Sequence, residues 1–135
     1  MTMMTSLITA GVRLAEALRE ENEALERLDL RRAVPLADAK MRASDAFAAA
    51  YAAVNKTGAR AEGTVRDTAA ELSNRLRGLS EENRRLLERA IALQSRVIET
   101  IAGAALPRAR PTTYGQAGGR VAPRVAAPIA FSARA

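Results

Sequence analysis

The chain of 135 residues contains no cysteine, no histidine and no tryptophan. Zinc and haem sites normally use thiolate or imidazole ligands, so we expect neither kind of site. A Cys–His nucleophile pair and a Ser–His–Asp triad cannot be built from this composition. Without cysteine no disulfide can form, which suits a reducing compartment such as the cytoplasm. We therefore expect a non-enzymatic, cytoplasmic chain without metal or cofactor.

Long apolar runs are also missing. No stretch of the sequence offers the roughly 18 or more consecutive apolar residues of a membrane-spanning helix. The apolar start of the chain has no basic residue ahead of it and is interrupted by Arg13 and Glu16, so we do not expect a signal peptide. Contact with a membrane is expected only through a partner.

Acidic residues are absent from the C-terminal segment 107–135. Its basic residues are Arg108, Arg110, Arg120, Arg124 and Arg134. Taking these five from the 21 basic residues leaves 16, against 15 acidic residues, so the body 1–106 is nearly neutral. A sequence pI near 10.9 suggests nucleic-acid binding. The segment has only Tyr114 and Phe131 to stack on bases, however, and we interpret it as a solvated basic tail.

What the sequence does contain is helical periodicity. Apolar positions near the N-terminus alternate in steps of four and three, which is typical of a coiled-coil seam. The positions are Leu7, Gly11, Leu14, Leu18, Glu21, Leu25 and Leu28. Gly11 and Glu21 are the weak points of this stripe. The pattern predicts a first helix that ends near Asp29.

Proline sets the expected start of a second helix. Pro35 lacks an amide proton and disfavours the α conformation at Val34, so the helix is expected to break or kink there. Pro35 suits the first position of a helix, which would run from about Leu36 to Asn55. The run from Asn55 to Gly58 is typical of a helix C-terminus.

The third segment is the most regular. Its four–three positions are Val65, Ala69, Leu72, Leu76, Leu79, Asn83, Leu86, Ala90, Leu93 and Val97. Because the spacing never slips, we predict one helix from about Glu62 to Ala105. Asn83 within the seam is the kind of residue that fixes helix register at a cost in stability.

A second apolar row widens this helix face from residue 86 onward. The face that it forms comprises Leu87, Ile91, Ile98, Ile101 and Leu106. One interpretation is that a neighbouring helix covers the row inside the bundle. The other is that the row is open to a partner helix, because two shorter helices cannot flank the whole third helix.

Together these patterns predict an all-α protein. Residues 1–106 would form an antiparallel helical hairpin or three-helix, coiled-coil-like bundle with one long C-terminal helix. Residues 107–135 would form a flexible tail, because prolines, glycines and arginines cannot bury enough apolar surface to offset chain entropy.

The sequence resembles the FlgN family of flagellar export chaperones. A Leu-Leu-Glu helix with Asn83 and Glu88 leads through Pro107 to the segment Tyr114-Gly115-Gln116-Ala117-Gly118, similar to the closing region of that family. The first half is similar in layout, with a Glu-rich helix up to Asp29 and an early lysine, Lys40, in the next helix. Pro35 and the segment after Arg120 depart from the family pattern.

The resemblance implies a cytoplasmic chaperone of type III flagellar export. Such a chaperone binds the C-terminal helical regions of hook–filament junction proteins, the FlgK and FlgL class, and delivers them to the export gate. The substrate helix would lie on the Leu87–Leu106 face, while Tyr114 and Gly115 would serve docking at the gate. No small-molecule substrate is implied. Two alternatives remain: a generic coiled-coil adaptor or self-assembling bundle, and a basic-tailed nucleic-acid-associated protein.

Overall fold

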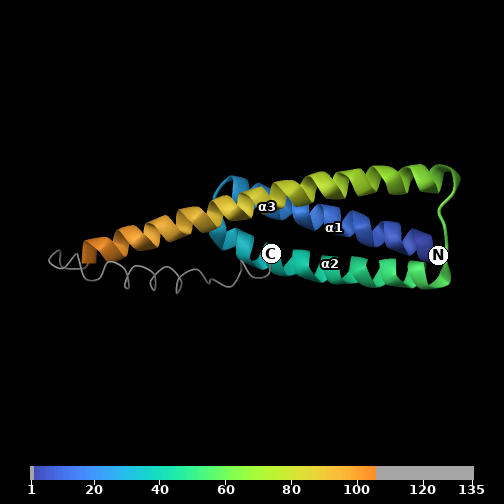
Figure 1. Cartoon of the computed structure of the whole chain (residues 1–135), viewed down its shortest axis with the longest axis horizontal. Coiled ribbons are helices and arrows are strands. Elements are labelled where there is room, and N and C mark those ends of the chain that lie inside the picture. Colours follow the sequence, from blue (N-terminus) through green and yellow to red (C-terminus); the bar gives the residue numbers. More distant parts are fainter. Residues whose placement is uncertain (1, 106–135) are drawn as a thin grey trace. The chain divides into compact units, whose positions relative to one another are not determined.

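The computed structural model describes residues 2–105 and contains three helices, drawn in Figure 1. They are α1 (Met3–Glu26), α2 (Leu30–Thr57) and α3 (Gly63–Ala105). No strand occurs in this part of the chain, so the all-α prediction is confirmed. The chain divides into two units, residues 1–86 and 87–135. The predicted tail 107–135 lies outside the described residues.

The turn between α1 and α2 is a Schellman motif with an unusual residue in it. The Asp29 amide donates to the Ala24 carbonyl at 2.9 Å, and the Leu28 amide donates to the Leu25 carbonyl at 3.0 Å. Leu28 has a φ of 57°, a left-handed conformation that glycine usually occupies at this position. Asp29 then caps α2, because its carboxylate accepts from the Arg32 amide at 3.2 Å.

The expected break at Pro35 is wrong. α2 begins at Leu30 and continues through Pro35. The Asp29 cap starts the helix before the proline, and Ala33 in its first turn is buried. Proline removes the hydrogen bond that the Arg31 carbonyl would accept within the helix. Arg31 is exposed, so water can donate to that carbonyl instead.

The other helix boundaries agree with the sequence predictions. Gly58 closes α2 with a left-handed φ of 76°, and its amide donates to the Val54 carbonyl at 3.1 Å. The predicted stop between Asn55 and Gly58 is thus confirmed. α3 is one continuous helix that starts one residue after the expected Glu62 and ends at Ala105.

Alanines allow α1 and α2 to pack closely. The backbones of these two helices approach each other more closely than either approaches α3. Five of the buried residues of these two helices are alanines: Ala15, Ala17, Ala24, Ala33 and Ala37. Because alanine adds only a methyl group beyond the backbone, the two helices form a tight antiparallel pair.

Within residues 1–86, α3 runs parallel to α1. Asn22 contacts Asn83, which is 61 residues further along the chain. Gly11 faces Leu72 at the same interval. A constant interval over this length means that the two helices advance together and keep their apolar stripes at matching levels.

Candidate functional site

Four buried polar residues lie where the three helices meet. Glu21 and Asn22 come from α1, Lys40 from α2 and Asn83 from α3. Their exposed fractions are between 1% and 6%. Charged side chains are almost never fully buried unless they are paired, so the contacts within this polar cluster decide whether it is tolerated.

Every member of the polar cluster contacts another member. The Lys40 ammonium lies 2.9 Å from the Glu21 carboxylate and donates to the Asn83 carbonyl oxygen at 2.9 Å. The Asn83 amide nitrogen donates to Glu21 and to the Asn22 side-chain oxygen, both at 2.7 Å. The Asn22 amide nitrogen donates to the Leu79 carbonyl at 3.2 Å. No buried side-chain nitrogen or oxygen among the described residues lacks a partner.

The polar cluster fixes how the helices align. Sliding α1 against α2 by one turn would separate the buried Glu21 carboxylate from the Lys40 ammonium, which costs several kcal/mol, on the order of 3–5. Sliding α3 would remove Asn83 from its hydrogen bonds to Glu21, Asn22 and Lys40. The predicted role of Asn83 in helix register is consistent with this geometry. The sequence pattern treated Glu21 as a weak point of the stripe, because periodicity alone gave no sign of its partners Lys40 and Asn83.

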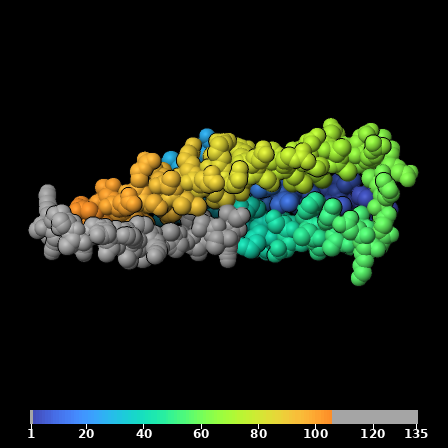
Figure 2. Space-filling view, in the orientation of Figure 1, coloured from blue at the N-terminus to red at the C-terminus, as the bar shows by residue number. Residues whose placement is uncertain are grey.

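An apolar groove opens in the same unit. It has a volume of about 530 Å³ and lies among α1, α2 and α3. Figure 2 shows α1, in blue, set back between α2 and α3. The groove is lined by Met4, Leu7, Ile8, Leu14, Phe47, Tyr51, Ala69, Leu72, Ser73, Leu76, Arg77 and Ser80.

Gly11 lies beside the lining of the groove. A Cβ atom at this position would lie 2.7 Å from Leu72 Cδ2 and 3.1 Å from Phe47 Cε1. The missing side chain of this glycine therefore lets one leucine and one phenylalanine approach α1. In the sequence pattern Gly11 is a weak point of the stripe, and in the structure the absent side chain leaves room for Leu72 and Phe47.

The seam of α3 is less buried along the groove than beyond it. Leu72 and Leu76 are half-buried and Val65 is 39% exposed, whereas Leu86 is 1% exposed. All four residues belong to the same four–three stripe. The bundle is therefore open along the first part of α3, where its leucines are covered on one side only.

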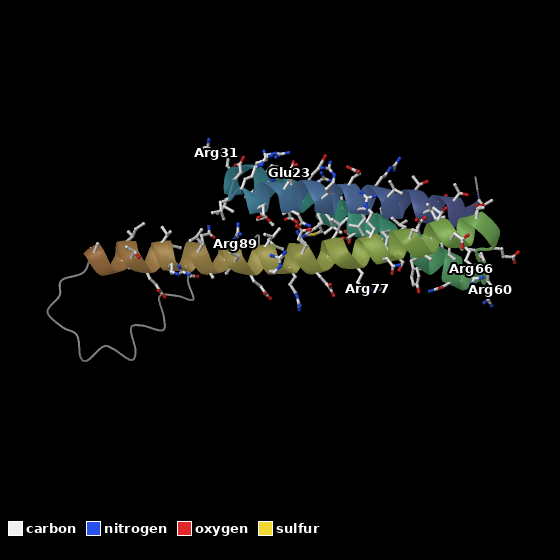
Figure 3. All side chains as sticks on the ribbon, turned by 90° about the horizontal axis from the view of Figure 1, so that it is seen from above. Glu23, Arg31, Arg60, Arg66, Arg77 and Arg89 are labelled. Atoms are coloured by element: carbon white, nitrogen blue, oxygen red, sulfur yellow. The ribbon has the colours of Figure 1, made fainter. Side chains whose placement is uncertain are left out.

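Arg77 is the only described residue with a charged side chain that lines the groove. The row next to the seam, at the same four–three spacing, consists of Arg66, Ala70, Ser73, Arg77, Ser80 and Arg84. The Arg77 guanidinium donates to the Asn74 side-chain oxygen at 3.0 Å and contacts no carboxylate of the described residues. Within the same part of the chain, Arg66 and Arg84 also form no ion pair. Figure 3 shows Arg77 projecting from α3 on the side away from α1.

The predicted partner-binding residues have different environments. Leu87 is buried at 5% exposure and Ile91 is half-buried. Ile98 and Ile101 are exposed at 36% and 63%. Leu106, Tyr114 and Gly115 lie outside the described residues. The sequence pattern identifies the groove residue Leu72 only as a member of an apolar stripe, because periodicity cannot show which part of a stripe stays uncovered.

Comparison with known proteins does not assign the chain to a family. No family model, curated protein or solved structure matches the chain. No helix in residues 2–105 is long and apolar enough to cross a membrane. The same residues contain no group of three acidic, histidine or cysteine side chains that could hold a metal ion.

Proposed function

We propose that the chain is a cytoplasmic export chaperone. It binds the C-terminal helical regions of hook–filament junction proteins of the FlgK and FlgL class and delivers them to the flagellar type III export gate. Two things support the proposal: the resemblance carried by Asn83, Glu88 and the segment from Tyr114 to Gly118, and the exposed apolar side chains near the end of α3.

The observation that carries the proposal is the exposure of Ile98 and Ile101. An isoleucine left in water forgoes about 1.5–3 kcal/mol of burial energy. Val97 beside them is also half-exposed, at 51%. A substrate helix that covers these side chains gains that energy and hides its own apolar face, which keeps the substrate unassembled.

The proposal gives two regions of the chain separate roles. The α3 face captures the substrate, and Tyr114 with Gly115 serves docking at the export gate. An aromatic side chain in a peptide segment can dominate a small interface, because its ring buries a large area at a low entropy cost.

The test uses the full chain and a purified hook–filament junction protein. Ile98→Asp combined with Ile101→Asp should abolish binding in calorimetry, while helicity and melting temperature stay unchanged because both side chains are exposed. The matched control is Thr100→Asp with Ala104→Asp, which adds the same charge at two other exposed positions of α3. Unchanged binding by the isoleucine variant would reject the proposed capture face.

The docking role has its own readout. Tyr114→Ala should leave substrate binding unchanged and reduce binding to export-gate components. Loss of substrate binding in this variant would instead move Tyr114 into the capture site. Sedimentation of the free chain separates the adaptor alternative, because a self-assembling bundle would use the same isoleucines as a dimer seam.

A further inference from the structure

The groove of residues 1–86 has the dimensions of a helix-binding site. Its lining on α3 runs from Ala69 to Ser80, which is about 16 Å or three helical turns. The lining on α1, from Met4 to Leu14, has nearly the same length. An elongated apolar trough between parallel and antiparallel helices matches the mode in which an amphipathic helix inserts apolar residues at i, i+4 and i+7.

The charge of the rim selects the occupant. Arg77 lines the groove, and Arg66 and Arg84 continue the same row about one helical turn beyond the two ends of the α3 lining. The row contains no acidic residue, and none of the three arginines forms an ion pair within the described residues. On α2, the groove is lined by the aromatic side chains of Phe47 and Tyr51. Within residues 2–105, Arg77 is the only lining residue of a charged type, so an incoming helix meets positive charge on the α3 side of the groove.

We propose that this groove binds an acidic amphipathic helix of about three turns from a partner protein. Its apolar face packs on Leu72, Leu76 and Phe47, and its acidic flank lies along the arginine row of α3. This inference does not depend on the export function proposed above, because the groove and its arginines lie apart in sequence from Ile98 and Ile101.

The experiment uses the full chain and designed peptides. One amphipathic peptide of about 15 residues carries leucines at i, i+4 and i+7, one tryptophan and a flank of glutamates; a second replaces the glutamates by lysines. The chain has no tryptophan, so peptide fluorescence reports binding without background. The glutamate peptide should bind at least about tenfold more tightly than the lysine peptide.

Charge reversal tests the arginine row. In the triple variant Arg66→Glu, Arg77→Glu, Arg84→Glu the preference should reverse, and the lysine peptide should bind more tightly. The control reverses three exposed arginines outside this row, Arg31, Arg42 and Arg85, and has the same net charge. The control should retain the preference for glutamate, because local pairing rather than total charge selects the peptide.

Blocking the groove tests the site itself. Ser73→Phe places a ring into the groove from an exposed lining position and should weaken binding of the glutamate peptide at least tenfold. The control Asn74→Phe changes an exposed residue outside the lining and should leave binding of this peptide unchanged. Equal binding of both peptides, or no effect of Ser73→Phe, would overturn the proposal. So would a dimer that Ser73→Phe dissociates, since the occupant would then be a second copy of the chain.

Discussion

The two ends of the bundle within residues 1–86 are built differently. At one end, Leu25 and Leu86 are 1% exposed, and the polar cluster is buried with all its side-chain polar atoms paired. At the other end, Leu72 and Leu76 are half-buried beside a groove of about 530 Å³. We call them the closed end and the open end. The same two stripes of α1 and α3 run through both ends, so periodicity does not account for the difference.

The difference lies in the residues that interrupt the stripes. At the closed end the interruptions are Glu21 and Asn83, whose polar side chains reach one another and Lys40. At the open end the interruption is Gly11, which has no side chain to reach across. The polar interruptions at the closed end thus hold the three helices in one alignment. The glycine at the open end leaves room between the helices. One end specifies the fold, and the other keeps apolar surface available.

The largest effect is expected from Lys40→Met. The substitution leaves the Glu21 carboxylate buried without its cation, at 1% exposure. Removing one partner of a buried ion pair costs about 3–5 kcal/mol. We expect the free energy of unfolding, from urea titration followed by circular dichroism, to fall by that amount.

The control removes the stranded charge as well. Glu21→Gln combined with Lys40→Met leaves no buried ion, and the introduced glutamine side chain can still accept a hydrogen bond from the Asn83 amide. The double variant should recover at least half of the loss. A single variant that loses less than about 1 kcal/mol would mean that the cluster is a solvated surface pair, for which values of that size are normal.

A matched pair of leucines compares the two ends directly. Leu86→Ala should cost about 2–5 kcal/mol, because the cavity that it creates cannot collapse easily. Leu76→Ala should cost about 1 kcal/mol, because its side chain is half-buried and already borders the groove. Both variants are measured by urea unfolding. Equal losses would show that the open end is closed in solution.

Much of the fold could be predicted because it depends on local signals. The unbroken spacing from Val65 to Val97 identified α3, and Gly58 identified the end of α2. The expected break at Pro35 does not occur, because the local effect of proline on a helix is only one of the terms that decide where α2 begins. The Asp29 cap and the burial of Ala33 outweigh the lost hydrogen bond, and both depend on the turn and on tertiary packing.

The candidate sites could be predicted only in part. Exposure of Ile98 and Ile101 agrees with an open apolar row, but Leu87 in the same row is buried. The polar cluster joins residues up to 62 positions apart, and a single sequence gives no measure of which polar side chains meet at that distance. The groove depends on where the apolar faces of the packed helices leave one another uncovered, and a single sequence does not show this.

A smaller effect is expected at the turn of the closed end. Leu28→Gly should stabilise the protein by about 0.5–1 kcal/mol. The left-handed conformation costs a non-glycine residue about 1–2 kcal/mol, and glycine removes this cost. Glycine also raises the conformational entropy of the unfolded chain, which cancels part of the stabilisation. Leu28 is 43% exposed, so little packing is lost. A lower melting temperature in this variant would show that the leucine side chain stabilises the turn.

The smallest effect is expected from Gly11→Ala at the open end. Alanine favours the helix by about 0.5–1 kcal/mol over glycine. Its Cβ would lie 2.7 Å from Leu72 Cδ2, so that methyl group must move. Leu72 borders the groove and can move into it at a small cost. This cost offsets the gain in helix propensity, so we expect the free energy of unfolding to change by less than about 0.5 kcal/mol.

Ala15→Val is the comparison variant. Ala15 lies one turn along α1 at 0% exposure, where no such space exists, so this substitution should cost about 1–3 kcal/mol. If Gly11→Ala were as damaging as Ala15→Val, the groove would be too rigid to admit even one methyl group, and a partner side chain could not enter it without unfolding the open end.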